Sequence, residues 1–517
     1  MKSFSVLSAY NLSSYAFKKM VNGISPFEAA CRKAADFPEC KKLLILTRQF
    51  QKTNITSFLN NVNFTADYEV SELESSTPHD VFSKTVEFIE KHSDFENIFF
   101  LHADMPFIDL KLTEKLFKNH IEYRAEYSFT DGYPIGLCPE IVNSGLCRIL
   151  AKVSKDDKTE ADRTFIFDTI KKDINNYDIE TVISPNDLRY LRLSFTADTK
   201  RNFLLCNEFT DINSENYAEL IKQKEDKLFT IPAYYGIEIN PVNPFNSIYK
   251  PEQKSAKKIM EKKDFFALAE KISNYSDDAV ISLSIFGEPL LHPDILEIIE
   301  KILSYPNLSV LIETTGSGWR TSMAEKIAEL VKNTPKRKNG ILPVYFIICI
   351  DAVSSAMYAN IHRINEDEAN IKLKQAVTFA DSINKVLPSA VWVQIIRMNE
   401  NESEVEPFYR FWKELNVNVI IQKFDTYCKQ LDDKRVADLS PFERRPCWHL
   451  KRDMYILSNG TVPLCKEDIF CKNILGNAFS DNFDSIREKA FKIYKEHLNC
   501  KYGGLCEHCD EYYTYNF

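Results

Sequence analysis

The chain has 517 residues, which is too long for one hydrophobic core, so about two to four domains are expected. It is 44% hydrophobic and 27% charged, as globular proteins are, and its net charge of −9 argues against a nucleic-acid or anionic-membrane partner. The apolar runs are too short to cross a bilayer, and the N-terminus carries no recognisable signal peptide. These features predict a cytoplasmic protein with no nucleic-acid and no membrane partner.

The first part of the chain, residues 1–228, alternates apolar runs with amphipathic segments of helix length. Strands are expected at Ser5–Ala9, Leu43–Leu46 and Asn97–Leu101, and a helix at Asp80–Lys91. This alternation predicts a mainly parallel α/β sheet. The polar, helix-prone stretch Ser214–Glu225 is expected to link this domain to the next one.

The second part, residues 229–426, repeats a strand followed by a helix six times. Helices are expected at Lys254–Ile272 and Glu402–Leu415, and strands at Gly236–Asn240, Ala279–Ile285, Leu308–Glu313, Val344–Ile350, Val391–Ile396 and Val417–Ile421. Six such repeats predict a partial (β/α)6 barrel, in which the chemistry lies at the carboxyl ends of the strands.

The third part, residues 427–517, is rich in cysteine. It holds seven of the 13 cysteines, and six of them lie within the last 71 residues: Cys447, Cys465, Cys471, Cys500, Cys506 and Cys509. Asn459-Gly460 is a tight-turn signal, and a hairpin of Asp453–Leu457 with Thr461–Leu464 would bring Cys447 close to Cys465. Cys506 and Cys509 form a CxxC pair. Four thiolates suit zinc or an iron–sulfur cluster, and the spacing alone does not separate the two.

Several blocks of this third part resemble the SPASM domain. They are Cys447-Trp448, Asn459-Gly460-Thr461-Val462, Cys465-Lys466-Glu467-Asp468, Leu475-Gly476-Asn477 and Cys506-Glu507-His508-Cys509. That family carries an auxiliary 4Fe-4S cluster behind a radical SAM barrel. The resemblance implies that Cys447, Cys465, Cys506 and Cys509 are the ligands. It assigns no role to Cys471 or Cys500, and His508 is expected to lie beside the site rather than bind in it.

The barrel resembles a radical SAM domain through the block Phe286–Pro293, with Thr314-Thr315-Gly316 after the next strand. In that family the Gly287-Glu288-Pro289 turn would hold the amino end of S-adenosylmethionine, and Glu288 is a suitable partner for an ammonium group.

The barrel departs from this family where the family has its CxxxCxxC motif. Asn243, Ser247 and Lys250 stand at the three cysteine positions, and no cysteine occurs between Cys206 and Cys349. Because these residues supply no thiolates, the chain is expected not to cleave S-adenosylmethionine. The Gly287-Glu288-Pro289 turn then has two interpretations: a structural turn, which we favour, or a site for another amino-acid-like ligand.

In the first part, Leu101–Pro106 and Arg192–Asp198 resemble two blocks of GT-A-like nucleotidyltransferases. The resemblance implies that Asp104 binds Mg²⁺ and that Tyr133–Gly136 forms a substrate loop. The resemblance is weak at the end that would bind phosphate, because no glycine-rich loop follows the first strand to place backbone N–H groups around a triphosphate.

The order of these three parts resembles the spiro-SPASM family. It implies an α/β fold with a GT-A-like parallel-sheet N-terminal domain, a degenerate radical SAM barrel and a small cysteine-rich domain. We expect an iron–sulfur protein with a redox or peptide-binding role and a peptide or redox-protein partner. The alternatives are a nucleotidyltransferase acting on a sugar or alcohol phosphate, and a non-catalytic scaffold whose cluster holds the fold.

Overall fold

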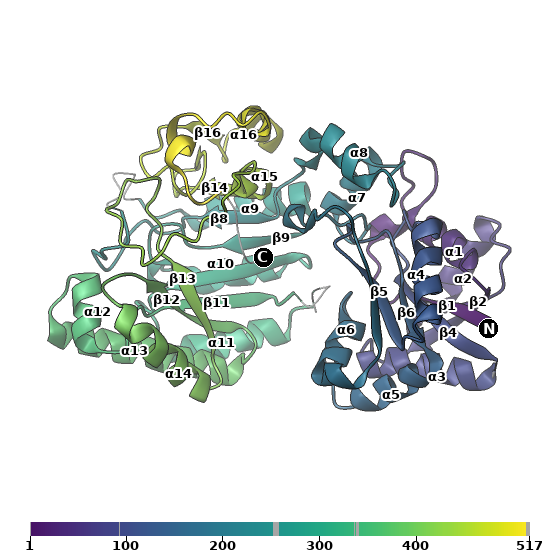
Figure 1. Ribbon diagram of the computed structural model, residues 1–517. Helices are drawn as coiled ribbons and strands as arrows, with labels where there is room; N and C mark the ends of the chain where they lie inside the picture. The colour runs from purple at the N-terminus through teal and green to yellow at the C-terminus, as the bar shows by residue number, and fades with distance from the viewer. Residues whose placement is uncertain (1, 93, 252–257, 336, 338–340, 513–517) are drawn as a thin grey trace. The chain divides into compact units, whose positions relative to one another are not determined.

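The computed structural model describes residues 2–92, 94–251, 258–335, 337 and 341–512. The chain forms two compact units, unit 1 up to Leu228 and unit 2 from Phe229 onward. Each is described by itself (Figure 1).

Unit 1 is built on a seven-stranded sheet in the order β3-β2-β1-β4-β6-β5-β7. Strand β6 runs antiparallel to both of its neighbours, and the other pairs are parallel. The strands are β1 (Lys2–Ser8), β2 (Cys40–Arg48), β3 (Tyr68–Leu73), β4 (Phe95–His102), β5 (Tyr127–Asp131), β6 (Glu140–Asn143) and β7 (Ile179–Ile183). The carboxyl ends of β1 and β4 therefore lie side by side, and the loops that follow them meet at one edge.

Helices pack on this sheet through amphipathic faces that begin at clear capping signals. In α3, for example, the Thr77 side chain accepts a hydrogen bond from the Asp80 amide, and Pro78 occupies the first turn. The helices are α1 (Pro26–Ala35), α2 (Lys52–Asn61), α3 (Pro78–Lys91), α4 (Leu110–Glu122), α5 (Ser144–Val153), α6 (Phe165–Ile170), α7 (Lys200–Glu208) and α8 (Tyr217–Gln223). The expected linker at 214–225 contains α8, whose Tyr217 and Ile221 are buried in the core of unit 1.

Unit 2 is built on a seven-stranded parallel sheet in the order β13-β12-β11-β10-β9-β8-β14. Its strands are β8 (Tyr234–Ile237), β9 (Ala279–Ser282), β10 (Leu308–Thr314), β11 (Val344–Cys349), β12 (Val391–Arg397), β13 (Asn418–Lys423) and β14 (Asp453–Ile456). The first six follow the predicted strand–helix repeats in order. Their helices are α9 (Lys262–Ser276), α10 (Ile295–Leu303), α11 (Thr321–Lys332), α12 (Ser355–His362), α13 (Glu366–Val386) and α14 (Glu402–Glu414).

Most of these helices bury one apolar stripe against the sheet. In α10 the residues at helical spacing, Ile295, Ile298, Ile299 and Ile302, are buried in the core shared with the strands. The helix expected at Lys254–Ile272 corresponds to α9. The first four residues of the expected helix, 254–257, lie outside the described residues.

The hairpin expected from Asp453 to Leu464 is wrong. A tight turn does form, with Gly460 at φ 83° and the Gly460 amide donating to the Leu457 carbonyl at 2.8 Å. The strands on its two sides, however, join different sheets. Strand β14 pairs in parallel with β8, and β15 (Thr461–Pro463) pairs antiparallel with β16 (Ile474–Asn477). The helices α15 (Trp448–Arg452) and α16 (Phe483–Leu498) complete the cysteine-rich segment.

The α/β fold class is confirmed: unit 1 has a mainly parallel sheet, and unit 2 has the strand–helix repeats predicted for a partial barrel. Within the described part of the chain, no helix combines the length and the apolar character that crossing a bilayer requires.

Candidate functional site

The four cysteines predicted as ligands come from three separate segments of unit 2. Cys447 is the residue directly before α15, Cys465 follows β15, and Cys506 and Cys509 lie in and directly after the short helix Gly504–His508. The pKa of Cys465 is raised first by burial and then by Glu467, Cys509 and Cys447. The pKa of Cys447 is raised in the same way, first by burial and then by the charges of Cys509 and Cys506. The structure therefore brings these thiols into one neighbourhood.

Burial is the largest influence on three of these four thiols. It raises the pKa of Cys506 to about 11, with the charge of Cys509 adding to the effect. A thiolate in this group is therefore costly without a counter-charge, because each negative sulfur destabilises the next. Bound metal cations supply that counter-charge, and a coordinating thiol is deprotonated.

A fifth thiol, Cys428, lies in the same group and was not predicted. It is buried, and it hydrogen-bonds Cys509, which raises the pKa of Cys428 and lowers that of Cys509. Glu511 also donates its backbone amide to the Cys509 sulfur at 3.3 Å. Cys428 lies 19 residues before Cys447 and belongs to no spacing motif, so nothing in the sequence pointed to it.

The other two cysteines of the C-terminal segment lie apart from this group. Cys500 is exposed. Cys471 packs against a small apolar cluster with Phe286 and Leu457, and the charges that raise its pKa after burial are Asp468 and Glu238. His508 is exposed, so it does not point into the buried thiol group.

A set of paired charges borders the thiol group. Asp425, Asp510 and Glu511 place one carboxylate oxygen each within 4.8 Å of one another. Lys466 contacts Asp425 at 2.8 Å, and Lys423 contacts Asp510 at 3.2 Å and Glu511 at 2.5 Å. These carboxylates already have cationic partners from the chain, so they do not call for a metal ion.

At the mouth of the barrel, the loop that would carry CxxxCxxC is filled by packed side chains. The Ser247 hydroxyl lies 2.8 Å from Nδ1 of His362, and both residues are buried. The Phe245 ring packs against His362 at a tilt of 40°, with ring centroids 4.7 Å apart, and the Tyr249 hydroxyl donates to Asp351 at 2.8 Å. The residues present do not fit a radical SAM cluster, because the loop is committed to this packing.

The Gly287-Glu288-Pro289 turn is also committed to internal contacts. Glu288 is 3% exposed; one of its oxygens accepts from the Thr314 hydroxyl at 2.5 Å and from the Leu290 amide at 3.1 Å. The other accepts from the Thr315 amide at 2.9 Å and its hydroxyl at 2.7 Å. A carboxylate has about four acceptor positions, so none remains for an ammonium group. This geometry favours the structural interpretation and does not fit S-adenosylmethionine at Glu288.

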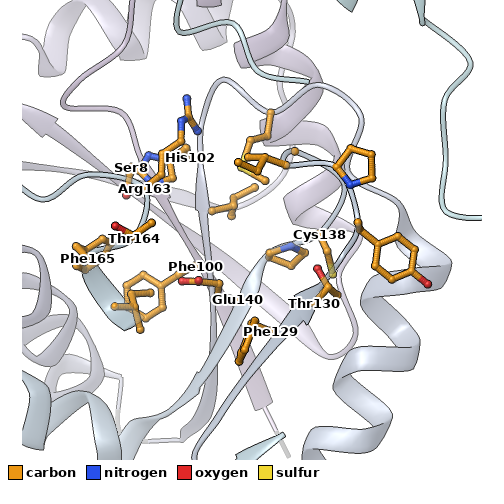
Figure 2. Close-up of a pocket in the computed structure, with 18 residues that line it drawn as sticks. Ser8, Phe100, His102, Phe129, Thr130, Cys138, Glu140, Arg163, Thr164 and Phe165 are labelled. Atoms are coloured by element: carbon orange, nitrogen blue, oxygen red, sulfur yellow. The ribbon is translucent and has the colours of Figure 1, made fainter. Parts of the chain in front are cut away.

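The predicted Mg²⁺ ligand in unit 1, Asp104, is bound by an arginine instead. Arg163 Nη2 lies 2.5 Å from Asp104 Oδ2, and Arg163 Nε lies 3.5 Å from Asp198 Oδ2. The guanidinium thus bridges Asp104, which the resemblance assigns to a metal, and Asp198 of the second resembling block, and the residues present do not fit a Mg²⁺ ion. Tyr133 and Gly136 of the expected substrate loop line an adjacent cavity of about 220 Å³ (Figure 2).

No family model matches the chain. An uncharacterized protein of Treponema pallidum (strain Nichols) is 48% identical over 358 residues, which cover 68% of this chain and 99% of that protein. Among solved structures, the cytidylyltransferase of Leptospira borgpetersenii serovar Hardjo-bovis (strain JB197) is 14% identical over 44% of this chain and 96% of its own, with a TM-score of 0.36. Streptococcus suis SuiB bound to precursor peptide SuiA is 11% identical over 67% of this chain and 78% of its own, with a TM-score of 0.40. Likenesses at these scores carry no functional argument.

Gly287→Ala tests the structural role of the turn. The added methyl would lie 1.9 Å from the Asn240 carbonyl oxygen, so the loop must shift, and we expect a loss of about 2–3 kcal/mol in the stability of unit 2. Gly503→Ala is the matched control, because its methyl meets nothing within 4 Å. All four tryptophans lie beyond residue 229, so a urea titration followed by tryptophan fluorescence reports on unit 2 alone. Equal midpoints for the two variants would contradict the assignment.

The lowered pKa of His362 predicts that the stability of unit 2 depends on pH. Burial, and then the charge of Lys250, lower its pKa to about 3, so the folded chain keeps the ring neutral while an unfolded chain protonates it below about pH 6.5. The unfolded state then binds more protons, and stability falls as the pH drops from about 6.5 toward 3. Between pH 7 and 5 this group accounts for about 2 kcal/mol.

His362→Gln removes the titration and keeps a side chain that can hydrogen-bond Ser247. Urea titrations at each pH, followed by tryptophan fluorescence, should show a steeper fall for the wild type than for the variant. Parallel profiles would show that His362 is not held neutral in the folded chain.

Proposed function

We propose that this chain, which belongs to the same family as the uncharacterized Treponema pallidum protein, binds a 4Fe-4S cluster through Cys447, Cys465, Cys506 and Cys509. The observation that carries the proposal is the convergence of these thiols, together with Cys428, from segments far apart in the sequence. Cys428 and Cys447 are buried, Cys465, Cys506 and Cys509 are half-buried, and all five are free thiols. Free cysteines gathered in this way are typical of metal sites, because a bound cation offsets the repulsion between their thiolates.

The spacing of the thiols favours a cluster over a single zinc ion. Four sulfurs around one zinc, with bonds of 2.3 Å, lie roughly 3.8 Å apart. Among the described residues, only the group Asp425, Asp510 and Glu511 brings three ligand atoms within 4.8 Å of one another, and no three thiols do so. A cluster with iron atoms at separate corners accepts thiolates that are farther apart.

The cluster would give the protein a centre for electron transfer, while the barrel would not generate radicals. The loop at Asn243, Ser247 and Lys250 offers no thiolate, and Glu288 is saturated by internal donors. The role that fits is that of a redox or peptide-binding protein of the spiro-SPASM type. Nucleotidyl transfer is less favoured, because Arg163 already bridges Asp104 and Asp198.

Metal analysis of the full chain purified without oxygen tests this proposal. We expect iron and acid-labile sulfide, with the absorption and EPR signatures of a 4Fe-4S centre. Cys509→Ser should lose most of the iron, because one ligand is gone, whereas Cys500→Ser, which changes an exposed thiol of the same segment, should keep it. Stoichiometric zinc without iron, or equal iron loss in both variants, would refute the proposal.

Cys428 provides a second test, since hydrogen bonds to cluster sulfurs raise the reduction potential. Cys428→Ala should keep the iron but lower the potential of the cluster, because Cys509 loses its hydrogen-bond donor. Cys428→Ser should change it less, since its hydroxyl can still donate. A redox titration monitored by EPR measures the cluster potential of each variant. Loss of the cluster in Cys428→Ala would instead make Cys428 a ligand and correct the set of four.

A further inference from the structure

Three charged side chains of unit 1 form a buried cluster at the edge of its sheet. Asp104 follows β4, Asp198 precedes α7, and Arg163 lies just before α6. Asp104 is 2% exposed, and its backbone carbonyl accepts from the Ala197 amide at 2.9 Å, which fixes the segments of the two aspartates against each other. Arg163 binds both carboxylates from a third segment.

The Arg163 guanidinium offsets the negative charge of Asp104 and Asp198, which would otherwise attract a metal ion. Burial raises the pKa of Asp104, and Arg163 opposes this effect. Asp198 is also buried, yet Arg163, Asn202 and Thr196 hold its pKa below the usual value. Asn202 Nδ2 and the Thr196 hydroxyl each donate to Asp198 at 2.8 Å. Because arginine keeps its proton at every physiological pH, this bridge is permanent.

A Mg²⁺ ion could not share this position. It needs oxygen ligands at 2.0–2.1 Å in near-octahedral geometry. Oδ2 of Asp104 already accepts from Arg163, and an ion at the other oxygen, Oδ1, would lie beside the buried guanidinium. The repulsion between the two would be strong in a buried site.

The adjacent cavity has more negative than positive charge around it. Among the described residues that line it, Arg163 is the only lysine or arginine, and its charge is already offset by Asp104 and Asp198. Glu140 lines the same cavity, and one of its oxygens accepts from the Tyr127 hydroxyl at 2.9 Å. His102, also in the wall, is kept neutral because burial lowers its pKa. Among the described residues of the wall, the one cation is therefore already paired with two carboxylates, which makes it a poor partner for a phosphate group.

The walls of the cavity suit a flat or apolar ligand body. Phe100, Phe129 and Phe165 line it, and Figure 2 shows Ser8, His102 and Arg163 gathered at one end with Glu140 placed among the aromatic rings. Aromatic faces beside a carboxylate favour a cationic ligand. Its volume of about 220 Å³ lies below the roughly 300–1,000 Å³ of typical ligand pockets, so we expect a small ligand.

We propose that Arg163 takes the place of a divalent metal ion between Asp104 and Asp198, and that the cavity beside it binds a small organic cation at Glu140 without any metal. The metal half of the proposal follows from the Arg163 bridge. The ligand half follows from the wall chemistry. The two are measured separately.

A Mn²⁺ titration of the full chain, followed by the loss of the free-ion EPR signal, tests the metal half. Wild type and Asp104→Asn should bind Mn²⁺ equally, since Asp104 is not a ligand. Arg163→Gln should gain a Mn²⁺ site that the double variant Arg163→Gln with Asp104→Asn lacks. Wild-type binding that Asp104→Asn abolishes would overturn the proposal. That comparison does not depend on whether Arg163→Gln folds.

Benzamidine and benzoate, which match in shape and differ in charge, test the ligand half by isothermal titration. Benzamidine should bind and benzoate should not, because an amidinium pairs with a carboxylate through two hydrogen bonds. Glu140→Gln should weaken benzamidine roughly tenfold. Burial raises the pKa of Glu140 to about 7, so binding should also weaken from pH 8 to pH 6 as the carboxylate takes up a proton. Equal binding of the two probes, no binding of benzamidine, or no effect of Glu140→Gln would overturn the ligand class.

Discussion

The parallel pairing of β14 with β8 is the constraint on which the candidate site of unit 2 depends. It aligns Asp453 with Tyr234 and Ile456 with Ile237, so a segment from the end of the chain becomes part of the sheet of the barrel. The strand is held at its start by Asp453, whose buried carboxylate accepts from His449 at 2.6 Å and from Arg452 at 2.5 Å. The lowered pKa of Asp453, about 2, reflects the interactions with Arg452 and His449 overcoming the cost of burial. The segments that carry Cys447 and Cys465 flank this strand, and its position therefore fixes theirs.

In both units, the chain's own side chains occupy positions where the sequence resemblances imply an inorganic cation. In unit 1 a guanidinium stands between Asp104 and Asp198. In unit 2 the loop that would bind a cluster is closed by the contact of Ser247 with His362 and by aromatic packing. In each case the strands and turns around the position remain intact, because packing and backbone hydrogen bonds specify them independently of a metal. Loss of an ion therefore need not change the fold, provided that its charge and volume are replaced.

The sequence predicted the sheet strands and the turns well, because these depend on local patterns. Strand–helix alternation located β8 to β13, and Asn459-Gly460 gave the correct turn. The predicted hairpin was wrong because the partner of a strand is set by tertiary packing, and the edge of β8 offered a parallel partner to β14.

Arg163 and Cys428 could not be predicted for a related reason. Arg163 lies in a loop without a motif, and its role appears only when three segments meet. Cys428 belongs to Tyr427–Lys429, where three consecutive residues adopt positive φ of 49°, 57° and 64°. Such a local path, without glycine, cannot be read from residue spacing.

The cysteine-rich segment shares its interior with the barrel, and this sets what a bound metal can influence. Cys447, Leu450 and Tyr494 belong to the same hydrophobic cluster as the strands and helices of the barrel. Arg487 of α16, buried in that region, donates to the carbonyls of Leu450 and Lys451 and to that of Thr230 at the start of unit 2. Ligand geometry at the thiols is thus connected through α15 and α16 to the β8 edge of the sheet. A scaffold role and a redox role are therefore not exclusive, because any ion held there would stabilise the same core that positions its ligands.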